Sequence, residues 1–124
     1  MELRVFVYFN LHKKVFSVKA LEGENKGRVI AHREYLDLHN VTFKVSEAGR
    51  QRVLRERKKN VHAGVVGYWE DTQHPKGTLL HNLQCKQITY NPYKYDSFVY
   101  IDAGIPERVY SAECAYLVDK QIFI

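Results

Sequence analysis

The sequence predicts a single α+β domain, in which an antiparallel β-sheet packs against one main basic α-helix. Three observations support this class. Short segments rich in β-branched and aromatic residues recur along the chain, with turn residues between them. One stretch, from Ser46 to Lys59, has the composition of a helix instead. The length of 124 residues and the hydrophobic content of 45% suit one core, so residues 1–124 are expected to form one domain.

The strands are expected on both sides of this helix. Residues 3–10 and 15–21 flank a short polar turn and therefore predict a β-hairpin. Further strands are expected at residues 28–32, 41–45, 61–69, 85–91 and 97–102. The segment from Ala112 onward has enough apolar residues for one or two closing strands. Glycine and proline predict a turn at residues 22–27 and a loop at residues 71–77.

The predicted helix has two different faces. Ser46 is a favourable N-cap residue. Counting about 100° per residue from Ser46 places Val53 at about 340° and Leu54 at about 80°, and these two apolar side chains define the inward face. Arg57 at about 20° and Arg50 at about 40° fall between them. The opposite half carries four further basic residues and one glutamine, namely Gln51, Arg52, Arg55, Lys58 and Lys59.

The helix also carries the excess charge of the chain. Residues 50–59 contain four arginines, two lysines and one glutamate, a net charge of +5 that equals the net charge of the whole chain. Basic residues on the outer half are expected to form a solvated face. Arg50 and Arg57 on the inner half need an anionic partner, because an unpaired buried charge is costly. That partner is either one of the 14 acidic residues or a phosphate or carboxylate of a ligand.

The sequence contains no recognisable catalytic, metal-binding or cofactor motif. The six histidines show no zinc-ligand spacing, and neither a phosphate-binding glycine loop nor a nucleophile elbow is present. Cys85 and Cys114 lie 29 positions apart and are expected to be reduced thiols. We therefore expect a protein that is not an enzyme and that needs no catalytic residues, metal or cofactor. No membrane span or signal peptide is expected either.

Residues suited to holding a nucleotide-like anion occur outside the helix. Arg28 directly follows the turn at residues 22–27, and Arg108 lies between two predicted strands. Asn91 and Tyr93 open a loop, and the chain contains nine tyrosines. Asparagine amides pair with adenine edges, and tyrosine offers a flat face for a base. The tyrosines are equally suited to packing in the core.

Three stretches of the chain resemble a phage-encoded family, the first type of Thoeris anti-defence protein. They are "VYFNLHKKVFSVKALEGENKGRVIAH", "VTFKVSEAGRQRVLRERKKNVHAGVVG" and "YNPYKYDSF". The resemblance implies a non-enzymatic sponge that binds cyclic ADP-ribose isomers (glycocyclic ADP-ribose) made by bacterial TIR-domain proteins. It also implies a homodimer or higher homo-oligomer with the ligand at subunit contacts, acting in the host bacterial cytoplasm. Some family members hold cyclic oligonucleotides in separate sites.

Seven residues are expected to bind the ligand. Arg28, Arg57, Asn91 and Arg108 fit the chemistry that the resemblance implies. Geometry and composition add Arg50, Tyr93 and Phe9.

Two other classes of protein remain open. A small basic nucleic-acid-binding phage protein would use the outer half of the helix, and its affinity would fall steeply with salt. A structural phage protein would bind neither kind of ligand. We rank the sponge first, so a nucleic acid and a membrane are not the expected partners.

Overall fold

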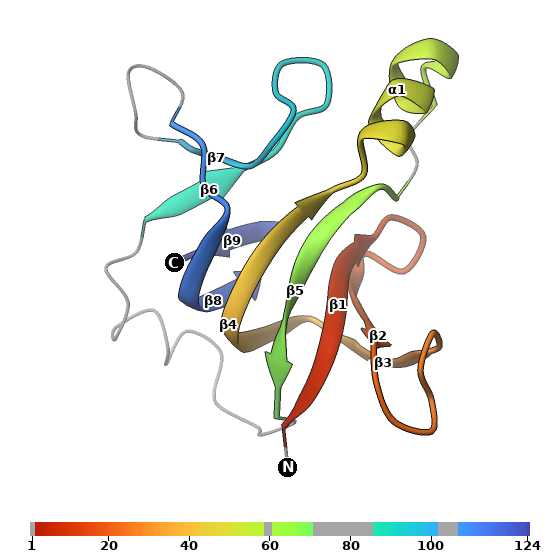
Figure 1. The fold of residues 1–124 in the computed structure, drawn as a ribbon, viewed down its shortest axis with the longest axis vertical. Helices are drawn as coiled ribbons and strands as arrows, with labels where there is room; N and C mark the ends of the chain where they lie inside the picture. Colours follow the sequence, from red (N-terminus) through yellow and green to blue (C-terminus); the bar gives the residue numbers. More distant parts are fainter. Residues whose placement is uncertain (1, 59–60, 71–85, 102–106) are drawn as a thin grey trace.

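A computed structural model describes residues 2–58, 61–70, 86–101 and 107–124 of the chain. Within these ranges it contains one helix, α1 (Glu47–Glu56), and nine strands (Figure 1). The strands are β1 (Leu3–Asn10), β2 (Val15–Ala20), β3 (Val29–Arg33), β4 (Tyr35–Val45), β5 (Ala63–Trp69), β6 (Gln87–Thr89), β7 (Val99–Tyr100), β8 (Ser111–Val118) and β9 (Gln121–Phe123). They form one sheet in the order β3-β2-β1-β5-β4-β8-β9-β6-β7, and all neighbouring strands in this order pair antiparallel.

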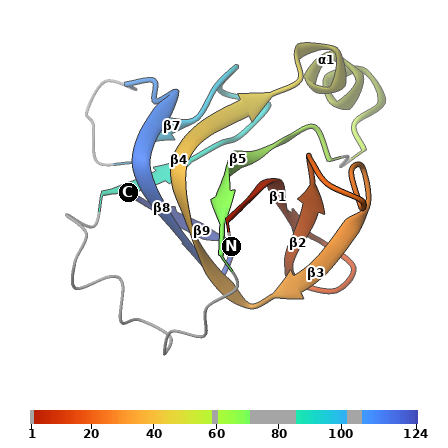
Figure 2. The same ribbon diagram turned by 60° about the horizontal axis from the view of Figure 1, so that its bottom comes forward.

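The sheet curls strongly around its own inner face. Only Glu34 separates β3 from β4 along the chain, whereas β2, β1 and β5 lie between them in the sheet. The β3 edge must therefore return toward the start of β4, and Figure 2 shows these five strands curving around a common interior. A register shift between His39 and Thr42, with Asn40 at a φ of 49°, falls where β4 changes its pairing with β5. Such bulges bend a strand and increase its twist.

The core fills the inside of this curled sheet. Val5 and Val7 of β1 are completely buried, and so is Leu38 of β4. Phe43 packs on Phe98, with 5.3 Å between the ring centroids. Alternation along β1 directs Phe6 and Tyr8 to the other face of the sheet. One face of β1 therefore belongs to the core and the other face belongs to the outer surface of the sheet.

The prediction of an α+β domain is wrong, because the fold is mainly β. Strands make up 53% of the residues that the structure describes, and the described helix has ten residues, of which only Val53 is buried. Figures 1 and 2 show α1 beyond the ends of β4 and β5, not across a sheet face. The sheet covers its apolar face by curling, so no helix layer is needed.

The separate elements agree better with the sequence. The β1–β2 hairpin is confirmed, and two strands close the chain as expected. Ser46 caps α1, with its Oγ accepting a hydrogen bond from the backbone N–H of Gly49 at 3.2 Å. β4 begins earlier than expected, at Tyr35. The loop at 71–77, Cys85 and Lys59 lie outside the described residues.

None of the described helices is long and apolar enough to cross a membrane.

Candidate ligand-binding site

A glycine in the first turn of α1 allows the start of this helix to lie close to the residue before β5. A Cβ atom added to Gly49 would lie 2.5 Å from the Cβ of His62, which is too close for any residue with a side chain. The backbone N–H of Ser46 also donates to the carbonyl oxygen of His62 at 2.7 Å. This approach brings the first turns of α1 over the segment that follows β6.

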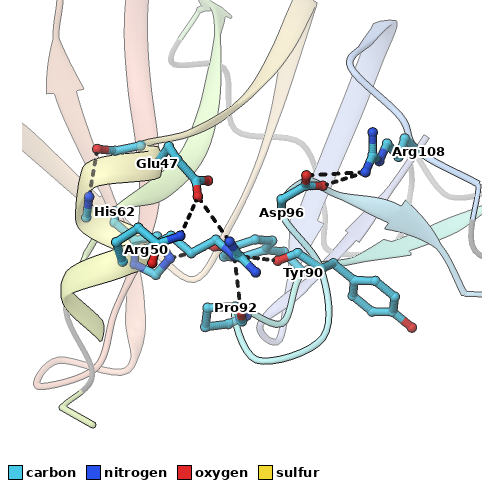
Figure 3. Close-up of polar contacts among 11 residues, drawn as sticks. Glu47, Arg50, His62, Tyr90, Pro92, Asp96 and Arg108 are labelled. Atoms are coloured by element: carbon cyan, nitrogen blue, oxygen red, sulfur yellow. Dashed lines mark hydrogen bonds and ion pairs between the residues drawn. The ribbon is translucent and has the colours of Figure 1, made fainter. Parts of the chain in front are cut away.

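Arg50 ties the helix to that segment, the loop at residues 91–96 (Figure 3). Its Nε donates to the carbonyl oxygens of Pro92 at 3.2 Å and Tyr95 at 3.0 Å. Its Nη1 lies 3.1 Å from Oε1 of Glu47, and the side chain is only 18% exposed. The expected inward direction of Arg50 is thus confirmed, and its partners include both an acid and two backbone carbonyls.

The 91–96 loop is stabilised by its first residue. The side-chain Oδ1 of Asn91 accepts a hydrogen bond from the backbone N–H of Tyr93 at 3.0 Å. Its carbonyl oxygen accepts from the N–H groups of Lys94 at 3.0 Å and Tyr95 at 2.8 Å. Both the side-chain oxygen and the backbone carbonyl oxygen of Asn91 therefore stabilise the turn.

Arg108 reaches the same loop from the far side. The backbone N–H of Val109 donates to the carbonyl oxygen of Phe98 at 2.9 Å, which fixes the segment beside the loop. Nη2 of Arg108 lies 3.1 Å from Oδ1 and 3.2 Å from Oδ2 of Asp96 (Figure 3). Both side chains are about half exposed, so an incoming anion can compete for this arginine.

These contacts surround a hollow of about 470 Å³, which we call the cationic cleft. It is lined by Arg50, Lys94, Tyr95, Asp96, Ser97, Val99 and Arg108. Ser97 is 9% exposed, and its Oγ has no hydrogen-bond partner among the described residues.

A second hollow, the aromatic groove, lies on the other side of the loop and has a volume of about 570 Å³. Its lining includes Tyr8, Phe9, Val53, Val61, His62, Tyr90, Asn91 and Tyr93. Tyr93 is 54% exposed, so its ring is accessible to a ligand. Burial raises the pKa of Tyr90 to about 12, although nearby Arg50 opposes this shift. The phenol of Tyr90 is therefore neutral at physiological pH.

A cysteine–histidine pair joins β4 and β8. Sγ of Cys114 lies 3.6 Å from Nδ1 of His39, whose Nε2 lies 3.6 Å from Oδ2 of Asp37. Burial raises the pKa of the thiol, and the charges of Glu113 and Asp37 act in the same direction. The thiolate is the nucleophilic form, so this environment disfavours it. Within the described ranges, no group of three or more His, Cys, Asp or Glu side chains is arranged to hold a metal ion.

Comparison with known proteins places the chain among phage proteins. A family described as Mycobacterium phage L5 gene 82 protein matches residues 1–124. The chain belongs to this family. The gene 82 protein of Mycobacterium phage L5 is 40% identical over 121 residues, which cover 90% of this chain and 91% of that protein. No solved structure gives a significant match.

In this gene 82 family member, five of the seven expected site residues lie around the 91–96 loop. Arg50 and Arg108 line the cationic cleft. Phe9, Asn91 and Tyr93 line the aromatic groove. Phe9 also has a packing role, because its ring meets Phe16 edge-on at 5.4 Å between centroids.

The other two expected residues, Arg57 and Arg28, line neither the cationic cleft nor the aromatic groove. Arg57 is exposed and forms the C-cap of α1 with a φ of 55°, so its expected position on the inward face is wrong. The angular count fails there because the helix ends at Glu56. Arg28 is exposed after the turn and lines neither the cleft nor the groove.

Several lining residues were not expected from the sequence. Lys94 directly follows Tyr93 in the same loop, and its positive charge could have indicated a contact to a bound anion. Ser97 and Tyr90 gave no local signal, because their positions depend on the pairing of β6, β7 and the segment at Arg108.

Proposed function

We propose that this phage protein binds a phosphate-bearing nucleotide signal and sequesters it without cleaving it. The supporting observation is the convergence of Arg50, Lys94 and Arg108 on the cationic cleft. These three cations come from α1, from the 91–96 loop and from the segment before β8. A pyrophosphate placed between them would receive charge-assisted hydrogen bonds from several directions.

Arg50 is suited to this role because its guanidinium group is held in place and still has N–H donors that make no hydrogen bond to the described residues. Its Nε is held by the two loop carbonyls, and Nη1 is held by Glu47. Its Nη2 has no hydrogen-bond partner among the residues that the structure describes. A guanidinium group already oriented by the fold loses little conformational entropy when it grips a phosphate.

Arg108 would exchange partners on binding. Its bond to Asp96 is half exposed, and such surface ion pairs contribute about 0–1 kcal/mol. A pyrophosphate, which carries about two negative charges in total, can therefore replace the carboxylate at small cost.

The base of the nucleotide would contact the aromatic side of the loop. Tyr93 and Phe9 line the groove there, and the remaining amide donors of Asn91 lie at its edge. Flat aromatic faces accept a base by stacking, with a contribution of about 1–3 kcal/mol per base.

The resemblance to the Thoeris anti-defence family identifies the signal class to test first. It favours cyclic ADP-ribose isomers of TIR-domain proteins, sequestered in the cytoplasm of the infected host. A homodimer or higher oligomer would enclose the ligand more fully than one open cleft. In that assembly, Arg28 and Arg57 would reach a ligand from a second copy of the chain.

A ligand-release experiment tests this proposal. The purified protein is incubated with a mixture of cyclic ADP-ribose isomers and linear nucleotides, washed and heated, and the released molecules are identified by mass spectrometry. We expect one isomer to be retained at about one molecule per site and released with its mass unchanged. Retention of no nucleotide, or accumulation of a hydrolysed product in proportion to the protein, would contradict the proposal.

Variants then locate the site. Arg50→Ala and Arg108→Ala are each expected to weaken binding of the retained isomer by at least tenfold in calorimetry, roughly 1.4 kcal/mol. Arg52→Ala is the matched control, because Arg52 lies on the same helix and pairs with Glu56 at 2.9 Å outside the cleft. Equal losses in all three variants would indicate a general charge effect instead of a site.

A further inference from the structure

A third hollow lies on the outer face of the sheet and adjoins the aromatic groove, with which it shares Tyr8, Val61 and His62. It has a volume of about 620 Å³, and we call it the outer cleft. It is lined by Phe6, Tyr8, Lys19, Gly27, Val29, Lys44, Val45, Ser46, Val61 and His62. Among the described residues, the lining contains two lysines and the rings of Phe6, Tyr8 and His62 but no acidic side chain. Its chemistry is therefore that of a site for an aromatic ligand with negative charge.

The floor of the outer cleft is an aromatic platform. Phe6 and Tyr8 alternate with buried residues along β1, and their ring centroids lie 6.0 Å apart with 33° between the ring planes. A Cβ atom added to Gly64 would lie 2.6 Å from Cζ of Phe6 and 2.8 Å from its Cε1. The absent side chain of Gly64 thus lets the Phe6 ring lie against β5. The ring is held as a surface on which another flat ring can stack.

The two lysines reach this platform from opposite sides. Lys19 of β2 is directly opposite Phe6, and Lys44 of β4 is directly opposite Gly64. Three strand spacings separate β2 from β4 in the order β2-β1-β5-β4, a distance of about 14 Å. Neither lysine has an ion pair or side-chain hydrogen bond within the described part of the chain. Both ammonium groups are therefore available to an external anion.

We propose that the outer cleft binds single-stranded nucleic acid. A base stacks on Phe6 and Tyr8, and the phosphates on either side of it meet Lys19 and Lys44. Cations on both sides of the platform suit a strand that continues past the stacked base in both directions. A mononucleotide carries its phosphate on one side only, and the bases of a duplex are not free to stack on protein. This combination of stacking rings and backbone charges is general for binding of single strands without sequence preference.

Fluorescence anisotropy with a labelled 15-mer of thymidylate tests the proposal. The double variant Lys19→Gln/Lys44→Gln is expected to weaken binding and to reduce the slope of log Kd against log salt by about 1.4, since each phosphate contact contributes about 0.7. Lys13→Gln/Lys14→Gln is the matched control, because both lysines are exposed in the β1–β2 turn and lie outside the cleft. An equal loss in the control, or no binding of the 15-mer at low salt, would overturn the assignment.

A second variant tests the stacking. Phe6→Leu keeps an apolar side chain over Gly64 but removes the flat ring, and we expect affinity for the 15-mer to fall by about tenfold. Thermal unfolding checks that the variant is folded. In the unmodified protein, a duplex of the same length should bind more weakly than the single strand, and free thymidine monophosphate should compete poorly. Equal binding of the duplex, or full competition by the mononucleotide at equal concentration, would overturn the proposal.

The outer cleft can be tested separately from the proposed nucleotide site. Arg50 and Arg108 do not line the outer cleft, so Arg50→Ala and Arg108→Ala should keep the affinity for the 15-mer within about twofold. Conversely, Lys19→Gln/Lys44→Gln should retain any cyclic ADP-ribose isomer that the unmodified protein binds. Loss of 15-mer binding in the arginine variants would place the nucleic acid at the 91–96 loop and refute a separate site.

Discussion

The imidazole Nε2 of His62 lies 2.6 Å from the phenolic oxygen of Tyr90 (Figure 3). This bond links the residue before β5 to the residue after β6, which are 28 positions apart in the chain. Tyr90 also stacks on Phe98, with 5.3 Å between the ring centroids. The base of the 91–96 loop is thus anchored to the sheet, and Arg50 anchors its tip to α1. The loop that separates the cationic cleft from the aromatic groove is therefore held both by the sheet and by α1.

The raised pKa of Tyr90 predicts a loss of stability at alkaline pH. Burial raises this pKa from 10.0 to about 12, so the phenol ionises more easily in the unfolded chain than in the folded protein. The stabilisation is complete below pH 10 and is lost as pH rises from 10 to about 12. We expect the free energy of unfolding to fall over this window by more in the unmodified protein than in Tyr90→Phe. Urea denaturation at a series of pH values measures the difference, and identical pH dependence in both proteins would contradict the shift.

Removal of Arg50 should destabilise the fold even without a ligand. Arg50→Ala leaves the carbonyl oxygens of Pro92 and Tyr95 without this donor, and we expect a loss of about 2 kcal/mol in the free energy of unfolding. Arg52→Ala is the control, because its pair with Glu56 is exposed and should contribute less than about 1 kcal/mol. Urea denaturation compares the two. A smaller loss for Arg50→Ala than for Arg52→Ala would mean that the loop contacts are not formed in solution.

The strands and the helix cap could be predicted locally, whereas the layering and the site could not. The hairpin at β1 and β2 and the cap at Ser46 depend on neighbouring residues, whose types are visible in the sequence. The curl of the sheet depends on the long-range pairing of β4 with β5 and β8, which has no local signature. The same limit applies to the site, because Arg50 and Arg108 come to line one cleft only through long-range pairing, including the bridge between Arg108 and Val99.

The angular count along the helix succeeded only where the helix exists. Val53 is buried and the Arg50 side chain is only 18% exposed, as their angular positions on the inward face of the helix predict. Arg57 lies one position beyond the last helical residue, in a left-handed conformation, and its direction is set by the turn. The basic residues continue past Glu56 without a break, so the charge pattern gave no sign of this end.

Gly49→Ala should destabilise the protein although alanine is the better helix former. Alanine stabilises a helix by about 1 kcal/mol relative to glycine, but its Cβ would lie 2.5 Å from Cβ of His62. We expect the steric term to dominate, with a net loss of about 1–3 kcal/mol. Thermal unfolding measures it, and Ala48→Gly at the exposed neighbouring position calibrates the helix term. A stabilised Gly49→Ala protein would show that α1 does not lie this close to β5.

Removal of the acid in the cationic cleft should strengthen ligand binding. Asp96 holds Arg108 at 3.1 Å and adds a negative charge beside the proposed phosphate position. In Asp96→Asn, Arg108 loses this competitor, and affinity for the retained cyclic ADP-ribose isomer should rise about two- to fivefold, or ~0.4–1 kcal/mol. Calorimetry measures the change. As a control, Glu56→Gln removes an acid outside the cleft and should leave affinity unchanged; weaker binding of Asp96→Asn would mean that the ion pair itself shapes the site.

Mixed subunits test whether the proposed oligomer shares its site. Arg50 and Arg108 line the same cleft of one chain, whereas Arg57 is exposed seven residues after Arg50, about 10 Å along the helix. If Arg57 contributes to binding, we expect it to act from the second subunit of a symmetric dimer. Arg50→Ala and Arg57→Ala should then each abolish binding alone. A mixture in equal amounts should recover about one quarter of the sites, because half of the dimers are mixed and each holds one intact site.

The matched mixture combines Arg50→Ala with Arg108→Ala. It should recover no binding, since both arginines belong to the cleft of the same chain and every mixed dimer lacks one of them in each site. Calorimetric stoichiometry distinguishes the mixtures, after subunit exchange has been verified with differently tagged chains. Recovery in the second mixture but not in the first would mean that the site pairs Arg50 with Arg108 of a neighbouring copy. Full binding by Arg57→Ala alone would remove Arg57 from the site and leave the cleft of a single chain as the complete binding surface.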